Sequence, residues 1–332
     1  QVLNLIIRRF EGYENIEADS ERWPIKFNVI RQGVCYAIVH WFDNHYRDFT
    51  DTTLRNTLTN FIAKARASST EKDNRNDLVE FMHKKVQEKM EKGSYCSFFS
   101  LVIDKDSCPQ PLIPKSFQTV TFLDLNELEI ARQITMEEYN IYAEIKPEEF
   151  QQLAWNTESL KHKAPNLLGM ISRFNHISNA FATLIVQEER IKGRKKIIEK
   201  LIKIIEHLES MNSFNMQMAI LSAFGQTPVH RLQHSFGALK PKILQAAQKY
   251  QSLFKSESSY KCYRERIAKV EPPAIPFIGV YLTDLTFVDQ GNGETINGKI
   301  NFRKKQLEYD VIIQVLRFQG TPYQFNLVPQ IP

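Results

Sequence analysis

The run from Ser210 to Leu232 constrains the fold of this chain more than any other segment. Asn212 and Ser213 are residues that favour the start of a helix, and an apolar stretch with helical spacing follows them. A turn that contains Pro228 ends this pattern. The segment therefore predicts a short apolar helix with defined ends, which favours a helical fold.

Helical periodicity also dominates the first third of the chain. Apolar residues recur every three to four positions in two amphipathic stretches, namely Val29, Ile30, Val34, Ala37, Ile38 and Trp41 in the first and Leu54, Leu58, Phe61 and Ile62 in the second. Asp51 and Thr52 precede the second stretch as candidate caps. Polar residues from 68 to 76 predict a loop, and a further helix is expected from about 77 to 92.

The strongest helical signal of the chain lies between Arg194 and Met211. Its apolar stripe is wide enough to be buried among other helices and consists of Ile197, Ile198, Leu201, Ile204, Ile205 and Leu208. Further helices are predicted over residues 126–145, from Pro147 onward, and over 241–254, 258–270 and 301–318. These patterns predict an all-α architecture.

A change in composition marks the expected domain boundary. Ser, Cys and Pro accumulate between residues 93 and 118, which is typical of a linker. We therefore expect an N-terminal helical domain over 1–100, a linker over 101–118 and a larger helical domain over 119–332. The chain begins abruptly in an apolar stretch, from which we expect it to be part of a longer protein.

Charge and composition exclude several classes of protein. The 332 residues include 43 basic and 38 acidic side chains, and the net charge of +5 is spread along the sequence, unlike the basic stripe that nucleic-acid binding needs. A hydrophobic fraction of 42% is ample for buried cores. One compact basic cluster, from Lys192 to Lys196, is interpreted as a solvated helix start in preference to a phosphate or lipid contact.

The cysteines and histidines have no spacing that is typical of a metal site or a catalytic centre. The four cysteines contain no CxxC pair, so the sequence predicts free thiols in a reducing cytosol. The histidines lie outside any Ser or Cys nucleophile motif. No apolar run approaches the roughly 18 residues of a membrane span. We expect a cytoplasmic protein with no cofactor, no metal and no covalent chemistry of its own.

One segment has the propensity of a strand. The residues from Val280 to Val288 are rich in β-branched and aromatic side chains. A predicted turn, Asp289 to Gly293, follows them, and apolar character returns at Ile300. On propensity alone this segment is a β-hairpin that stands out from a helical body.

Five ordered blocks resemble the catalytic domain of Ras-family guanine-nucleotide exchange factors. They are FLDLNELEIARQITMEEY from Phe122, IKPEEFQQLAW from Ile145, NLLGMISRFNHIS from Asn166, the run from Ser210 to Leu232, and PPAIPFIGVYLTDLTF from Pro272 with INF at Ile300. The N-terminal stretches IKFNVIR from Ile25 and WFDNHYRDF from Trp41 are similar to the Ras-exchanger-motif domain that usually precedes it. The first helix of that domain, or part of it, is missing from the match.

The resemblance implies an all-α fold in which an N-terminal brace supports a larger catalytic domain. It implies that residues 277–318 form a protruding helical hairpin, and we follow it here because tertiary packing overrides β-propensity readily. It also implies a function. Such a domain binds a Ras-family small GTPase, with the Ras or Rap branch favoured, remodels its switch regions and promotes GDP release so that GTP can bind. Recruitment to membranes would come from regions or partners outside this fragment.

The same resemblance assigns candidate site residues. The GTPase-binding groove would be lined by Leu168, Met170, Ile171, Met218, Tyr260 and Phe277. The hairpin wedge would carry Asp284, Thr286, Asp289 and Gln290. Without the resemblance, the first set is ordinary helical core and the second is a strand and a turn.

Departures from the family pattern leave a second function open. Ser172 and Gly225 lack the longer polar side chains that some members present, and Gln290 cannot supply a carboxylate near the phosphate site. The alternative is an all-helical GTPase-binding or scaffold module that keeps the fold but lacks exchange activity.

Overall fold

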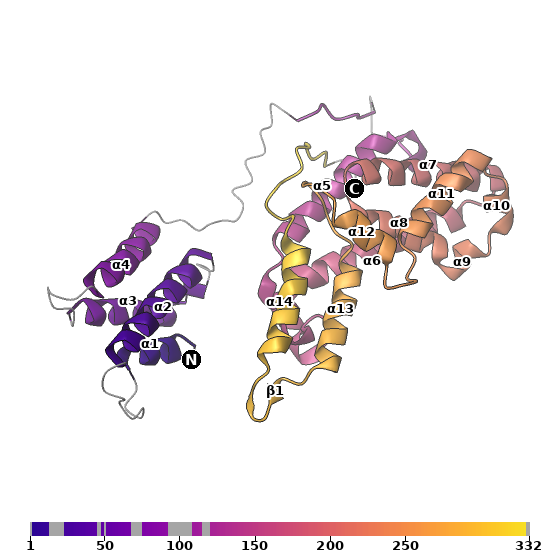
Figure 1. Ribbon diagram of the computed structural model, residues 1–332. Coiled ribbons are helices and arrows are strands. Elements are labelled where there is room, and N and C mark those ends of the chain that lie inside the picture. The colour runs from indigo at the N-terminus through magenta and orange to yellow at the C-terminus, as the bar shows by residue number, and fades with distance from the viewer. Residues whose placement is uncertain are drawn as a thin grey trace. The chain divides into compact units, whose positions relative to one another are not determined.

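The structure is a computed structural model that describes residues 2–12, 23–44, 48–49, 51–67, 75–91, 108–114 and 120–329. It divides into two compact units, residues 1–100 and 101–332, which are described separately (Figure 1). The predicted loop over 68–76 lies mostly outside the described residues, as does most of the predicted linker over 101–118.

The first unit consists of amphipathic helices around a small apolar core. Its helices are α1 (Val2–Glu11), α2 (Trp23–Asn44), α3 (Thr52–Ala67) and α4 (Arg75–Glu91). The Phe10 ring packs edge-on against Phe61, with 5.1 Å between the centroids. Asp51 accepts hydrogen bonds from the backbone N–H groups of Thr53 and Leu54, at 2.7 and 3.0 Å, so it caps α3 as the sequence predicts.

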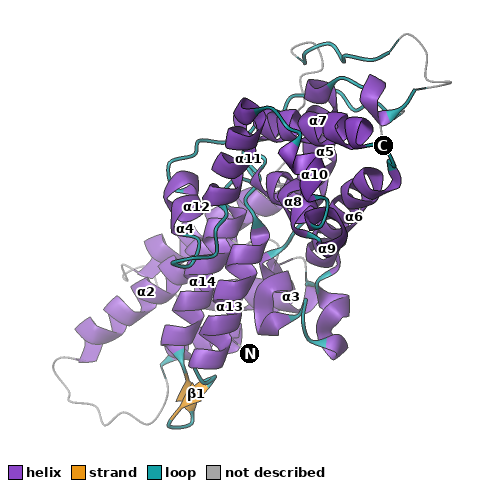
Figure 2. Ribbon diagram, turned by 90° about the vertical axis from the view of Figure 1, so that its right-hand side faces the viewer, coloured by secondary structure: helices purple, strands orange, loops and turns teal. Residues whose placement is uncertain are grey.

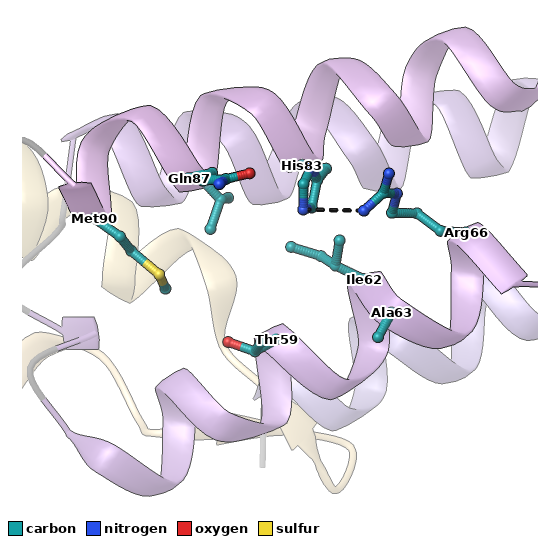
Figure 3. Close-up of a pocket in the computed structure, with 8 residues that line it drawn as sticks. Thr59, Ile62, Ala63, Arg66, His83, Gln87 and Met90 are labelled. Carbon is teal, nitrogen blue, oxygen red and sulfur yellow. Dashed lines mark hydrogen bonds between the residues drawn. The ribbon is translucent and has the colours of Figure 1, made fainter.

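A shallow pocket lies between the facing sides of α3 and α4 (Figure 3). Its lining is mainly apolar and is formed by Thr59, Ile62, Ala63, Arg66, His83, Val86, Gln87 and Met90. At one end Arg66 binds the Glu80 carboxylate at 2.6 Å and lies 3.2 Å from Nε2 of His83. This polar end closes off the pocket between the two helices.

The second unit is also helical. Its elements are η2 (Phe122–Asp124), α5 (Glu127–Ala143), η3 (Pro147–Leu153), η4 (Glu158–Lys163), α6 (Pro165–Gln187), α7 (Ile191–Ser210), α8 (Phe214–Gly225), α9 (Thr227–His230), α10 (Gln233–Gly237), α11 (Pro241–Leu253), α12 (Lys261–Ile267), α13 (Ile278–Gly291), β1 (Thr295–Ile296), β2 (Lys299–Ile300) and α14 (Phe302–Leu316). The all-α prediction is confirmed, since the two strands contain two residues each.

The core of the second unit is built on α5, α6, α7 and α8, which pack on one another. All six residues of the predicted α7 stripe are buried, as expected for a helix surrounded by others. Helix α8 is buried over most of its length, in line with the few charges in its sequence. Among the described residues, no helix combines the length and apolarity that a bilayer crossing demands.

Helices α13 and α14 form a hairpin that projects from the body (Figures 1 and 2). Its far end is an antiparallel ribbon in which Thr295 pairs with Ile300. The helical prediction for residues 277–318 is confirmed, and the strand propensity of this segment is overridden. Burial explains the result, because α13 packs Ile278, Tyr281 and Leu285 into the core at spacings of three and four residues.

Three local predictions need correction. The predicted turn at residues 289–293 is displaced: α13 continues to Gly291, and the chain reverses at Asn297 and Gly298, which both have positive φ. The helix predicted over 258–270 begins only at Lys261, because residues 258–260 are left-handed. The helix that starts at Pro147 is a kinked 3-10 segment, interrupted by non-helical backbone at residues 151 and 152.

Candidate functional site

An aromatic cluster surrounds Phe277 at the start of α13. Ring centroids of four residues lie between 6.0 and 6.3 Å from the Phe277 centroid, namely Phe174, Phe254, Tyr260 and Tyr263. The backbone N–H of Phe277 donates a hydrogen bond of 2.8 Å to the Tyr263 hydroxyl. Burial raises the pKa of Tyr263 well above its ordinary value, so this hydroxyl stays protonated. The base of the hairpin is thereby fixed to α12.

The other predicted groove residues lie on α6 and α8, which pack closely together. Leu168, Ile171 and Met218 are half-buried beside the core. Met170 is completely buried, so it belongs to the core itself. Together with Tyr260, four of the six predicted groove residues therefore lie at the margin of the core, whereas Met170 and Phe277 are buried in it.

Phe174 is a site residue that the sequence reasoning missed. Leu168, Ile171 and Phe174 follow one another at spacings of three on α6, so they share one face of that helix. The Phe174 ring stacks on Phe277 with 26° between the planes. This contact connects the α6 row to the hairpin base. The spacing from Ile171 was the signal in the sequence that could have identified it.

Tyr260 has a backbone conformation that the sequence did not predict. It precedes α12 with φ of 60° and ψ of 38°, which is left-handed and uncommon for an aromatic residue. Its half-buried ring faces Phe277 edge-on, with 6.2 Å between the centroids. The unusual backbone therefore directs the ring toward the aromatic cluster.

Three of the four predicted wedge residues make contacts within the unit. Asp284 pairs with Arg264 through two hydrogen bonds of 2.8 Å. The Thr286 hydroxyl donates to the Leu282 carbonyl at 2.8 Å, one helical turn earlier. Asp289 accepts from Lys304. Gln290 is exposed near the end of α13.

Lys304 is a buried cation inside the hairpin, with only 2% of its side chain exposed. Its ammonium group lies 2.6 Å from Asp289, 2.6 Å from Glu294 and 4.0 Å from Glu308. These carboxylate oxygens lie within 4.8 Å of one another, a spacing at which they could share a metal ion. Lys304 supplies the positive charge instead. Its hydrogen bond, followed by that of Lys305, lowers the pKa of Glu294 below its ordinary value.

A buried carboxyl connects the core to the hairpin base. Glu138 on α5 accepts a hydrogen bond of 2.6 Å from the Asn215 side chain on α8. The side-chain oxygen Oδ1 of Asn215 in turn accepts from the backbone N–H of Ile278 at 3.4 Å. Burial raises the pKa of Glu138 to about 8, so the carboxyl is neutral at pH 7.

These features define an α-helical domain in which a rigid hairpin projects beside a partly exposed apolar row. The comparisons with known proteins then identify its family. The RasGEF domain family matches residues 129–306, more than half of the chain, and the chain belongs to this family. The match does not include the N-terminal unit.

Named relatives come from Dictyostelium discoideum. The chain is 33% identical to Ras guanine nucleotide exchange factor J over 99% of its own length and 40% of that protein. It is 34% identical to Ras guanine nucleotide exchange factor A, over 91% of this chain and 50% of that protein. Ras guanine nucleotide exchange factor K is 40% identical over 63% of this chain and 14% of that protein. The chain thus spans half or less of the length of these relatives.

Proposed function

We propose that this chain is a guanine-nucleotide exchange factor for a Ras-family small GTPase, with the Ras or Rap branch favoured. It would remodel the switch regions of the GTPase and promote GDP release so that GTP can bind. The observation that carries this proposal is the hairpin, which stands clear of the body at its tip and is fixed at its base beside the aromatic cluster of Phe277.

Two surfaces would share the work. The apolar row around Phe277, with Leu168, Ile171 and Met218, would bind one switch segment, while Met170 supports it from within the core. The hairpin would displace the other switch segment from the nucleotide, and Gln290 is the predicted wedge residue that faces solvent. A GTPase holds its nucleotide through phosphates and Mg²⁺, so a wedge that competes with these contacts accelerates release.

The reduction in activation free energy that this mechanism requires is within the range of one protein interface. A ten-thousandfold acceleration requires a barrier lower by ~5.5 kcal/mol, which a single protein interface can supply. Linkage makes the effect reciprocal. If the exchange factor lowers the affinity of the GTPase for its nucleotide, the nucleotide lowers the affinity of the GTPase for the exchange factor by the same factor. The cellular ratio of GTP to GDP would then set the direction of exchange.

The remaining assignments belong to the same proposal. Residues 1–100 would form a Ras-exchanger-motif-like brace, 101–118 a linker and 119–332 the catalytic domain. The protein would act in the cytoplasm and reach membranes through regions or partners outside this fragment.

Release of a fluorescent guanine nucleotide tests the proposal. The chain is mixed with Ras, Rap, Ral and Rho-type GTPases loaded with the labelled nucleotide, and release is followed in excess unlabelled GTP. We expect acceleration with a Ras or Rap protein and none with a Rho-type protein. Binding of a nucleotide-free GTPase without acceleration would instead establish the scaffold alternative.

A further inference from the structure

One end of the second unit is strongly basic. From Ser210 through Ser256 the chain contains no acidic residue. Arg231, Lys240 and Lys242 fall within this stretch, and all three are exposed. The predicted basic cluster at the start of α7 adds the exposed Lys192 and Lys196.

Contacts between helices bring these cations to the same end. Arg194 in the first turn of α7 donates a hydrogen bond of 3.0 Å to Ser235 on α10. Lys249 near the end of α11 lies 3.1 Å from Glu209 near the end of α7. Helices α7 and α11 therefore run in the same direction, and both begin beside α10. Figure 1 shows α9, α10 and α11 grouped at the end of the unit away from the β-ribbon.

We call this surface the basic end and define it by its exposed cations, Arg190, Lys192, Lys196, Arg231, Lys240 and Lys242. Within the described part of the chain, none of the six forms an ion pair. Glu188 and Glu189, in the loop before α7, are the acidic residues at its border, and Glu188 accepts from the backbone N–H of Arg190. The cations outnumber these carboxylates.

The position of the cations works against helix stability. The N-terminus of a helix carries partial positive charge, so acidic side chains stabilise it and basic ones do not. Neither α7 nor α11 has an acidic residue in its first turn. Arg190 and Lys240 occupy their N-cap positions, and neither accepts a capping hydrogen bond. The start of α11 thus adds to the positive potential, whereas the Glu188 carboxylate beside Gly193 offsets part of it at the start of α7. The excess of cations over carboxylates remains suited to an anionic partner.

Exposed apolar side chains accompany the cations. Ile191 opens α7 with 45% of its surface exposed, and Leu244 in the first turns of α11 is 37% exposed. Nucleic-acid phosphates gain nothing from aliphatic side chains, and single strands are bound by stacking on aromatic rings. A lipid surface rewards both kinds of residue, because cations contact the headgroups while apolar side chains enter the interface.

We propose that the basic end is a docking surface for membranes that contain anionic lipids. The cations would contact lipid phosphates and carboxylates, and Ile191 and Leu244 would enter the boundary of the acyl region. Its cations lie at the starts of α7 and α11 and between α9 and α10, whereas the aromatic cluster surrounds the start of α13, so the basic end is separate from that cluster and from the hairpin. It would add a direct membrane contact of the second unit, independent of any GTPase, to recruitment through regions or partners outside this fragment. The proposal replaces the interpretation of residues 192–196 as a solvated helix start.

Vesicle sedimentation of the whole chain tests the proposal without a GTPase, so its outcome is independent of exchange activity. We expect binding to phosphatidylcholine vesicles that contain phosphatidylserine, weakening as salt rises, and none to pure phosphatidylcholine. Each cation at an anionic surface contributes about fivefold to binding. Lys192→Glu, Lys196→Glu and Lys242→Glu together should therefore lower the partition coefficient at least about a hundredfold.

A matched variant makes the same change in charge elsewhere. Lys163→Glu, Lys269→Glu and Lys299→Glu replace three exposed lysines away from the basic end, and binding should change by less than about fivefold. Ile191→Ser with Leu244→Ser should weaken vesicle binding with all charges retained. Equal losses in the two charge variants would overturn the proposal. A second pattern would also overturn it: the double serine variant binds vesicles as the parent chain does, and the parent chain binds a labelled DNA duplex as tightly as it binds vesicles. These two results together would describe a surface that binds any polyanion.

Discussion

Arg264 and Asp284 join α12 to the hairpin through a bidentate ion pair with two contacts of 2.8 Å. Tyr260, the residue immediately before α12, has a ring that contacts Phe277. One short helix is therefore attached both to the aromatic cluster and to the middle of α13. The orientation of the hairpin and the shape of the apolar row are consequently coupled.

Breaking this pair should slow exchange more than it weakens GTPase binding. Arg264→Ala removes the lateral attachment of the hairpin but leaves the apolar row intact, so we expect the maximal exchange rate to fall about tenfold, equivalent to ~1.4 kcal/mol. The KM for the GTPase should change less than threefold. Both side chains are about one third exposed, so the loss of stability should stay near ~1 kcal/mol.

A charge exchange provides the control for that prediction. Arg264→Asp combined with Asp284→Arg recreates an ion pair with its partners reversed, and it should recover part of the maximal rate that either single change loses. A double variant no faster than the slower single variant would contradict a positioning role for the pair. Steady-state exchange at varied GTPase concentrations separates the two parameters.

Phe277→Ala should abolish acceleration of nucleotide release. The truncation removes the ring that four aromatic neighbours surround, and it should destabilise the second unit by ~3–5 kcal/mol. Phe277→Leu keeps most of the volume and serves as the folded variant, for which we expect at least a tenfold loss. Phe236→Ala is the matched control, because Phe236 is a half-buried ring on α10 that packs on Phe224. Equal activity of the two alanine variants, at a temperature where both are folded, would remove Phe277 from the site.

Lys304→Met should loosen the hairpin. The change leaves Asp289 without its cation and leaves Glu294 and Glu308 with Lys305 alone, and we expect a destabilisation of ~1–3 kcal/mol. Millimolar Ca²⁺, which favours carboxylate oxygens, should raise the melting temperature of this variant but not that of the parent chain. The exposed Lys299→Met on the ribbon is the control and should respond in neither way. A calcium response in the parent chain would show that the carboxylates are available even with Lys304 in place.

Glu138 should make the second unit less stable as pH rises from about 4.5 to about 8. Below this window the carboxyl is protonated in both the folded and the unfolded chain, so it has no effect. Within the window the unfolded chain loses the proton and the folded chain keeps it, because the folded pKa is about 8. By pH 7 the stability should have fallen by an amount on the order of 3 kcal/mol.

Glu138→Gln tests this pH dependence. Glutamine is neutral throughout and can still accept the hydrogen bond from Asn215, so the variant should be more stable than the parent chain at pH 7.5 and equally stable at pH 4. Urea unfolding at both pH values measures the difference. Glu189→Gln, at an exposed position, should leave the profile unchanged. Parallel profiles for the parent chain and Glu138→Gln would mean that Glu138 is ionised in the folded state.

Periodicity predicted the helices well where burial determines them. Helix α7 is the clearest case, because each apolar residue of its stripe lies in the core. The left-handed residues Ser258, Ser259 and Tyr260 could not be predicted, since their conformation depends on tertiary contacts such as the ring packing of Tyr260 on Phe277. The strand propensity of α13 misleads for the same reason.

The candidate site likewise contains residues that the sequence predicted and residues that it did not. The resemblance to a known family led us to predict Phe277, Leu168 and Ile171 as site residues, whereas Phe174, Arg264 and Lys304 were not predicted. These three act through partners that lie far away in the chain or across a turn, such as Phe277 for Phe174. A linear sequence records side-chain types and their spacing, but the pairing across elements emerges only from the fold.

The chain reversal at Asn297 and Gly298 is a suitable region for attaching a spectroscopic label. Both residues are exposed, but the positive φ of 73° at Gly298 disfavours any side chain there, so the adjacent exposed Lys299 is the better point of attachment. The ribbon connects α13 to α14. Arg264 holds the middle of α13, and Lys304 links the end of α13 to the start of α14. A fluorophore attached at this reversal would leave the core unperturbed. Its emission would report movement of the hairpin in real time as a partner binds.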